Sequence, residues 1–376
     1  MTKRLACVLT LTIACGTRPS VSAQTPPEGM VAQSVAGQTL FLRPGFKITV
    51  FATAEGVRNL ALGPGGAIYA ALQRSGRVIR IAHADGDTVA GATSDVATGL
   101  NGPFGIAFRG DTMYVGEMTR VTRFAPGSTT GQSIVTGLPS GGHSTRTVVF
   151  GPDGHMYVAV GSSCNICNES DPRRAAVTRF NADGSGEHRF ATGLRNSVGL
   201  AFNPSTGELW ATNNDRDDIG GSITAPLTQD LPPEHLNILK DGKFYGWPQC
   251  YLPGKPNPEY ASANCSTVEP PTITFQAHSA PLGITFYTES AFPGYKGDAF
   301  LTYHGSWDRS VPTGAKVVHV KVQNGKAVAI EDFVSGWQLP DGSRWGRPVA
   351  VLALPDGSLL ISDDQGGKIW RVSYGK

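Results

Sequence analysis

Charge is scarce in this sequence, and long apolar runs are missing. Only 16% of the 376 residues are charged, and the formal net charge is +2 at pH 7. Because no run of Lys or Arg occurs, we do not expect nucleic acid among the partners. No apolar stretch is long enough for a membrane-spanning helix, so no membrane span is expected. No long helical stretch occurs between the strand-like segments, which excludes a doubly wound α/β fold.

Glycine and proline are abundant instead, with 47 and 26 residues. Apolar residues alternate along short segments, and Asp-Gly or Pro-Gly pairs separate many of these segments. Such alternation with turn residues between the segments is typical of antiparallel β-hairpins. The composition therefore predicts an all-β protein.

The N-terminus has the pattern of an export signal. A positively charged start is followed by an apolar stretch over residues 5–14 and by small residues before Gln24. This pattern predicts a signal peptide over residues 1–23 and a periplasmic or secreted mature chain. Cys15 offers a lipoprotein site as an alternative, although Thr12 stands where Leu is usual.

Outside the signal the chain has only four cysteines, which are Cys164, Cys167, Cys250 and Cys265. An even number in an exported protein predicts disulfides, and proximity pairs Cys164 with Cys167 and Cys250 with Cys265. The stretch "CNIC" has rival interpretations. A c-type haem site would need His where Asn168 stands, a thioredoxin-like motif would need a βαβ unit, and a zinc site would need a second pair of ligands.

The chain repeats one unit six times. The copies begin at Arg58, Pro103, Arg146, Ser197, Pro281 and Pro348. Each copy contains two strand-like runs joined by a turn, and further strand-like runs precede and follow it. Six units of four antiparallel strands predict a six-bladed β-propeller, in which the blades bury their faces against one another. We expect the strand over residues 46–52 to close the last blade, an N-terminal extension over residues 24–40 and the propeller over 41–376.

Equivalent polar residues precede the inner strand of every blade. Counting back seven residues from the end of that strand gives Glu55, Asn101, His143, Arg195, Ser279 and Arg347, and neighbouring positions add Arg58, Arg146, Asn196 and His278. In a propeller these positions should meet at one end of the central channel. Several Arg residues at one place predict an anionic ligand, because guanidinium binds carboxylate or phosphate bidentately. Solvated loop residues, or Arg residues that join neighbouring blades, are the alternative interpretation.

The stretches "GGHSTRTVVFGPDGHMYVAVG", "GLRNSVGLAF", "AHSAPLGITFY", "YHGSWDRSVPTGAKVV" and "LLISDD" resemble the soluble glucose/sorbosone dehydrogenase family. The family consists of exported six-bladed propellers that carry pyrroloquinoline quinone (PQQ) and calcium. The resemblance covers most of the chain after the signal, and "SSCNIC" with "HGSWDR" favours the sorbosone-dehydrogenase-like branch.

The resemblance implies a function and a set of site residues. His143 would be the base that takes the proton of a sugar hydroxyl while hydride moves to PQQ. The implied cofactor-binding residues are Arg58, Arg195, Asn196, His278, His304 and Arg347. Trp307 and Arg309 would lie at the substrate site, and Arg216, Asp217 and Asp218 would supply calcium ligands. Electrons would pass to an external acceptor such as a separate cytochrome, because the chain has no haem motif.

Two other functions remain open at this stage. One is a calcium-dependent propeller hydrolase of the lactonase kind, and the other is a binding propeller without catalysis. The hydrolase would need several carboxylates on the axis, and Glu55 is the only acid at the equivalent positions. The sequence therefore favours a PQQ-dependent dehydrogenase acting on an aldose or sorbosone-type sugar.

Overall fold

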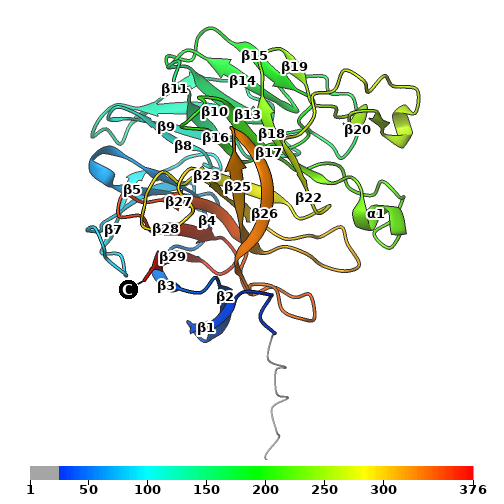
Figure 1. Ribbon diagram of the computed structural model, residues 1–376. Coiled ribbons are helices and arrows are strands. Elements are labelled where there is room, and N and C mark those ends of the chain that lie inside the picture. The colour runs from blue at the N-terminus through cyan, green and yellow to red at the C-terminus, as the bar shows by residue number, and fades with distance from the viewer. Residues whose placement is uncertain (1–24, 376) are drawn as a thin grey trace, which may run out of the picture.

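The computed structural model describes residues 25–375, and its sheets are arranged around a central axis (Figure 1). The predicted signal peptide and the alternative lipoprotein site at Cys15 lie outside these residues. No helix among residues 25–375 has the length and apolar character needed to cross a membrane. The predicted all-β, six-bladed propeller of four-stranded antiparallel blades is confirmed.

The first three blades follow the repeat order. Blade one contains β4 (Val57–Leu62), β5 (Ile68–Leu72), β6 (Arg77–Ile81) and β7 (Thr93–Ala97). Blade two contains β8 (Ile106–Arg109), β9 (Thr112–Glu117), β10 (Arg120–Phe124) and β11 (Gly131–Val135). Blade three contains β12 (Val148–Phe150), β13 (Met156–Val160), β14 (Ala176–Phe180) and β15 (His188–Thr192), and β19 (Lys243–Phe244) pairs with β15 in parallel.

The remaining blades carry the longer loops. Blade four contains β16 (Leu200–Phe202), β17 (Leu209–Asn213), β18 (Glu234–Leu239) and β22 (Ile273–Phe275). Blade five contains β23 (Pro281–Phe286), β24 (Ala299–Tyr303), β25 (Lys316–Gln323) and β26 (Lys326–Ser335). Blade six contains β27 (Pro348–Ala353), β28 (Leu359–Asp363), β29 (Lys368–Tyr374) and β3 (Phe46–Thr53). The small elements α1 (Pro226–Asp230), β20 (Cys250–Leu252) and β21 (Lys255–Pro256), and 3₁₀ turns at Pro64–Gly66 and Pro258–Tyr260, lie in the loops.

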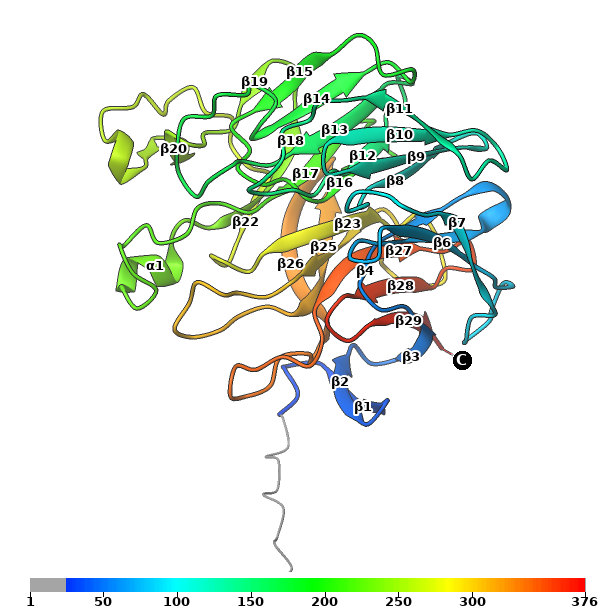
Figure 2. The same cartoon turned by 180° about the vertical axis from the view of Figure 1, so that it is seen from behind.

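Both ends of the described chain are held by sheets. As expected, β3 pairs with β29 and so closes the last blade. The segment treated above as an extension forms a hairpin of β1 (Val31–Val35) and β2 (Gln38–Leu42), and β2 pairs with the outer edge of blade five through β26. Figure 2 shows this hairpin below the ring, beside the closing blade. The expected boundary at residue 41 therefore falls inside a strand.

Buried hydroxyls join neighbouring blades near the axis. Thr212 on β17 donates to the carbonyl of Leu282 at 2.9 Å, and Thr302 on β24 donates to that of Val349 at 2.7 Å. Ser362 on β28 repeats the contact across the closure by donating to the carbonyl of Arg58 at 2.6 Å. Below the end of the channel, Phe104, Val198, Leu282 and Val349 form an apolar cluster. Two of its members, Val198 and Leu282, also line a cavity at that end of the axis.

We expect Gly199→Ala to destabilise the propeller. An added methyl at Gly199 would overlap the carbonyl oxygen of Leu282 on the next blade, so the inner strands would have to move apart. Overpacking of this kind costs about 1–3 kcal/mol. Urea unfolding measures the loss, and Gly91→Ala is the control because its methyl would meet Ala82 only at 3.4 Å. Equal unfolding midpoints for the two variants would contradict the close approach.

Candidate active site

A polar cavity of about 320 Å³ opens at one end of the axis. Its wall comes from every blade except the second. The lining residues are Arg58, His143, Ser144, Thr145, Arg195, Asn196, Val198, Asn214, Asp215, Asp217, Glu234, His278, Ala280, Leu282, His304, Trp307 and Arg347. Segments separated by nearly 300 residues in the sequence therefore share one site.

Most of the predicted site residues line this cavity. They are Arg58, His143, Arg195, Asn196, Asp217, His278, His304, Trp307 and Arg347. Among the six equivalent ring positions, Glu55, Asn101 and Ser279 do not line it. The guanidinium of Arg146 is also elsewhere, because it donates to the carbonyls of His143 at 2.9 Å and Thr145 at 2.8 Å. Arg146 thus shapes the loop that carries His143.

Three further predicted residues lie beside the cavity. Arg309 does not line it, and its guanidinium donates to the carbonyls of Gln229 and Val311. Arg216 does not line it either, because its side chain pairs with Glu259 at 2.5 Å. Asp218 is exposed and does not line the cavity either, and its backbone amide donates to the carboxylate of Asp308 at 2.7 Å.

His143 is held with one ring nitrogen against the protein. Its Nδ1 lies 3.1 Å from the carbonyl oxygen and 3.0 Å from the hydroxyl of Ser162. Since a carbonyl only accepts, and the Ser162 hydroxyl itself donates to the carbonyl of Cys164 at 2.7 Å, Nδ1 must carry the proton. Nε2 of the neutral ring is then a free base. Burial, assisted by the charge of Arg195, lowers the pKa of His143 to about 4, so the ring is neutral at pH 7.

Arg195 is buried in the wall and its orientation is set by several acceptors. Nη1 donates to the carbonyl of Asp215 at 2.7 Å, and Nη2 pairs with the carboxylate of Asp217 at 3.0 Å. Nε donates to the carbonyl of Asn165 at 3.0 Å. These acceptors allow a charged residue to stand directly before the apolar strand of blade four. Arg195 presents a positive charge to the cavity while its other donors are satisfied.

A second set of cationic side chains lies where blade six meets blade one. Arg58 Nη1 pairs with the Asp364 carboxylate at 2.6 Å, and His304 Nε2 lies 3.0 Å from the other oxygen of that carboxylate. Arg347 donates to the carbonyl of His304 at 2.8 Å. Burial alone would raise the pKa of Asp364, but His304 and Arg58 hold it well below its usual range. Burial also lowers the pKa of His304 to about 4, so this ring is neutral at pH 7.

Two buried acids in the cavity were missed by sequence reasoning. Burial raises the pKa of Asp215 to about 7 and that of Glu234 to about 8. Glu234 accepts a hydrogen bond from the backbone amide of Asp215 at 2.7 Å, so the two groups adjoin. Glu234 begins β18, which was not identified as a strand because a long loop precedes it. Glu55, the only acid at the six equivalent positions, does not line the cavity, whereas Asp215, Asp217 and Glu234 all do, so the acids of the site lie outside the repeated frame.

Two carboxylates and an imidazole meet at one side of the cavity. His278 Nδ1 lies 3.6 Å from Asp217 and 3.8 Å from Asp308, and the three groups offer metal-ligating atoms within 4.8 Å of one another. His278 Nε2 lies 2.8 Å from the carbonyl of Thr228, so Nε2 carries a proton. Burial and the charge of Asp217 raise the pKa of Asp308. The cluster of Asp217, His278 and Asp308 therefore favours a bound positive charge, either a proton or a metal cation.

Comparison with known proteins agrees with this fold and cavity. A family model described as TrAA12-like matches residues 40–259 and 254–375. A "Pyrroloquinoline quinone-dependent sugar dehydrogenase" of Hypocrea jecorina is 27% identical over 75% of this chain and 76% of its own. An "Uncharacterized protein" of Borreliella burgdorferi is 34% identical over 62% of this chain, which spans only 61% of that relative. The PQQ domain of Coprinopsis cinerea pyranose dehydrogenase, in its holo form, has the same fold, with a TM-score of 0.75, 20% identity and coverage of 94% and 99%.

The fold and the cavity define a class of protein, the β-propeller with a cationic site and a buried base on its axis. The chain belongs to the TrAA12-like family. The predicted relationship to the PQQ-dependent soluble sugar dehydrogenases, which are oxidoreductases, is thereby confirmed at the level of the family. The narrower sorbosone-dehydrogenase-like branch stays a prediction.

The tautomer and pKa of His143 can be measured directly. In the protein without added ligand, we expect the NMR signals of this imidazole to titrate near pH 4, because burial and Arg195 disfavour the charged ring. Protonation should be confined to Nδ1 at pH 7. The His143→Gln variant assigns the signals by their disappearance. A midpoint near 6.5, or a proton on Nε2, would contradict the geometry.

Proposed function

We propose that this protein is an exported quinoprotein that oxidises an aldose or sorbosone-type sugar by hydride transfer to PQQ and passes the electrons to an external acceptor. The observation that carries the proposal is the cavity itself. It joins a neutral base with a free nitrogen, His143, to three guanidinium groups, those of Arg58, Arg195 and Arg347. This combination suits an anionic redox cofactor and an alcohol substrate.

The donors in the cavity fit a cofactor with three carboxylates. Arg58 Nε is buried and has no hydrogen-bond partner among residues 25–375, which is costly unless a ligand accepts from it. Arg195 and Arg347 approach the cavity from blades four and six, so anionic groups at separate ends of one ligand could be bound. When bound, PQQ would supply the ortho-quinone that accepts hydride.

His143 and Trp307 are the residues that we assign to the substrate. His143 Nε2 would take the proton of the sugar hydroxyl, and the Ser162 contacts keep its Nδ1 protonated meanwhile. Trp307 is 66% exposed at the mouth, where an indole face can pack against a sugar ring. Arg309 lies farther out, and its role in substrate binding remains part of the proposal.

Calcium would be held where Asp217 and Asp308 converge. Hard cations prefer carboxylate and carbonyl oxygens, and these carboxylates lie in one cluster with His278. The carbonyl of Asp217 accepts from Asn165 at 2.9 Å and that of Asp218 accepts from Arg216 at 3.4 Å. The Asp217 carbonyl also accepts from Arg216 Nε at 3.0 Å, so it would have to give up a hydrogen bond to bind calcium. A carbonyl ligand from Arg216 or a carboxylate ligand from Asp218 stays part of the proposal, with Asp308 added to the set.

One feature favours a second candidate function. The buried acids Asp215 and Glu234 meet the requirement for carboxyls on the axis that a calcium-dependent hydrolase would have. Family membership favours the dehydrogenase, as does the grouping of three guanidinium groups around the cavity. Export is supported by the disulfides Cys164–Cys167 and Cys250–Cys265, which pair as predicted and suit an oxidising compartment.

Reconstitution tests the function. Purified protein is incubated with PQQ and Ca²⁺, and dye reduction is followed with a panel of aldoses and sorbosone-type sugars. His143→Gln should bind PQQ as the native protein does but lose about 10²–10⁴-fold in kcat, because the base is gone.

Arg347→Gln should weaken PQQ binding by at least about tenfold, because a hydrogen-bonded charge is lost. Absence of PQQ uptake at micromolar concentrations, together with calcium-dependent lactone hydrolysis, would reverse the choice between the two functions.

Calcium binding is tested separately on the cofactor-free protein. Asp308→Asn should reduce Ca²⁺ affinity at least about tenfold in calorimetric titration, because one carboxylate ligand is removed. The matched control is Asp332→Asn, which removes an acid that pairs with Lys316 at 2.6 Å and does not line the cavity. Equal affinities in both variants would move the metal away from the Asp217–Asp308 cluster.

A further inference from the structure

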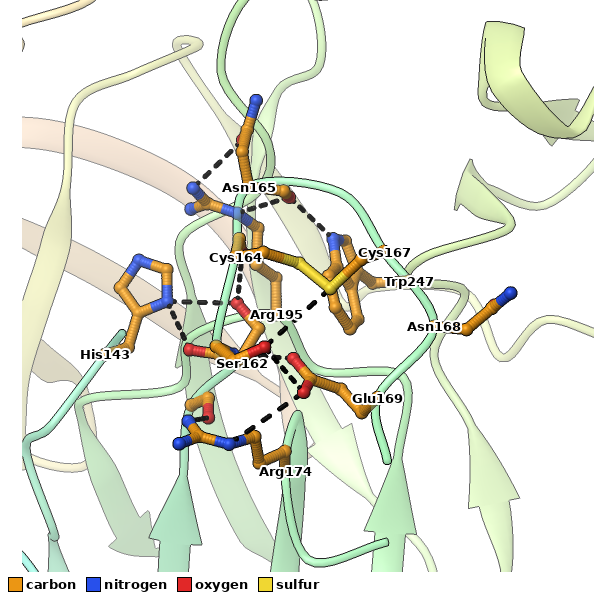
Figure 3. The surroundings of a disulfide bond; sticks show 12 residues. His143, Ser162, Cys164, Asn165, Cys167, Asn168, Glu169, Arg174, Arg195 and Trp247 are labelled. Carbon is orange, nitrogen blue, oxygen red and sulfur yellow. Dashed lines mark hydrogen bonds and ion pairs between the residues drawn. A yellow bond between two sulfur atoms is a disulfide. The ribbon is translucent and has the colours of Figure 1, made fainter. Parts of the chain in front are cut away.

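The loop of residues 162–169, which we call the disulfide loop, lies beside His143 and Arg195, which both line the cavity (Figure 3). The Cys164–Cys167 bond closes a small ring that contains Asn165, and these residues are half-buried. None of the residues 162–169 lines the cavity. The loop nevertheless reaches three cavity residues through hydrogen bonds that it donates or accepts.

Asn165 contacts two of those residues with both its backbone and its amide. Its carbonyl accepts from Arg195 Nε at 3.0 Å, and its Oδ1 accepts from Arg195 Nη2 at 3.0 Å. Oδ1 also accepts from the backbone amide of Asp217 at 2.8 Å, while Nδ2 donates to the carbonyl of Asp217 at 2.9 Å. An amide is required for this pattern, because a carboxylate has no donor for the Asp217 carbonyl.

The same loop also reaches the base. Ser162 places its carbonyl and hydroxyl against Nδ1 of His143, and its hydroxyl proton is directed to the carbonyl of Cys164 at 2.7 Å. The carbonyl that orients Ser162 therefore belongs to a residue of the disulfide. Moving Cys164 would free the Ser162 hydroxyl to rotate, and the protonation of His143 would no longer be restricted to Nδ1 by two acceptors.

The outer side of the loop is anchored independently. Glu169 accepts from the amide of Ser163 at 2.6 Å and from its hydroxyl at 2.8 Å. Trp247 Nε1 donates to the carbonyl of Asn165 at 3.0 Å. With these contacts intact, the disulfide acts on the short segment between Cys164 and Cys167, whose freedom to change conformation it restricts.

We propose that Asn165 is a positioning residue for Arg195 and Asp217, and that the Cys164–Cys167 bond keeps the disulfide loop in the conformation that orients this pair and His143 together. The proposal rests on the proposed function only for its kinetic readout. Asn165 touches neither the cavity nor a reacting atom, so its effect is transmitted through the residues that it holds.

The first experiment uses the protein without cofactor. Hydrogen exchange of the backbone is compared among the native protein, Asn165→Ala, and Cys164→Ser with Cys167→Ser. Both variants should exchange at least about tenfold faster at the amide of Asp217, because its acceptor on Asn165 is lost or mobile. Asn168→Ala is the matched control, since it removes an exposed side-chain amide of the same loop whose hydrogen-bond partner within residues 25–375 is Tyr260. Unchanged exchange at Asp217 in both variants overturns the proposal.

The second experiment separates orientation from general damage. In Asn165→Asp, the carboxylate can still accept from Arg195 and from the backbone amide of Asp217 but cannot donate to the Asp217 carbonyl. We therefore expect partial retention of PQQ binding and exchange at the Asp217 amide close to that of the native protein. Asn165→Ala should weaken PQQ binding by about tenfold or more, because Arg195 loses the Oδ1 acceptor of its Nη2 and keeps only the backbone carbonyl of residue 165. The double Ser variant should lower kcat more than it raises KM, because it also releases Ser162 and His143. Native binding and kcat in all three variants would refute the positioning role.

The exchange experiment and the binding and kinetic experiment together separate this proposal from the proposed function. If the native protein takes up no PQQ, the proposed function fails, and the exchange comparison still decides whether Asn165 positions Asp217. Unfolding midpoints identify a variant that is merely destabilised. If Asn165→Ala is too unstable to compare, the variant with Cys164→Ser and Cys167→Ser decides the question through the amide of Asp217, with Asn165→Asp, which retains the acceptors, as the reference for native exchange.

Discussion

Closure of the ring by β3 against β29 is the constraint on which the site depends. The pairing of the first propeller strand with the last one makes blade six from both ends of the chain. It brings Arg58 and Asp364 to 2.6 Å, although 306 residues separate them in the sequence. The Ser362 hydroxyl then joins blade six to blade one as Thr212 and Thr302 join the blades before it. Without closure, one cationic wall of the cavity would not exist.

Within the closed ring, the cavity balances buried charges of opposite sign. Arg195 is paired with Asp217, Arg58 with Asp364, and the acids Asp215 and Glu234 have pKa values raised by burial. Such a cavity is organised before a ligand arrives, because its charged side chains are already held by the protein. The disulfide loop extends this organisation outward, since Asn165 supports the Arg195–Asp217 pair and Ser162 supports His143.

Much of the site was predictable because repetition makes positions equivalent. His143, Arg195 and Arg347 occupy the same place in three copies, and all three line the cavity. Glu55 occupies that place too but does not line it, because equivalence predicts the end of the strand and not the direction of the side chain. Glu234, Asp308 and Asn165 come from long loops or their ends, where no repeat is visible. Their roles arise from contacts between loops that are distant in the sequence.

The sequence by itself determined the all-β class, the number of blades, the closing strand and the pairing of the cysteines. Alternating apolar residues, turn residues and the close spacing of the paired cysteines are local signals. They can be read from the sequence without knowing which segments pack together in the fold. Only the tertiary structure decided which acids are buried on the axis, which ring nitrogen of His143 is free, and which side chains hold Arg195. Those properties depend on desolvation and on hydrogen-bond partners that the fold brings together, and no local pattern encodes either one.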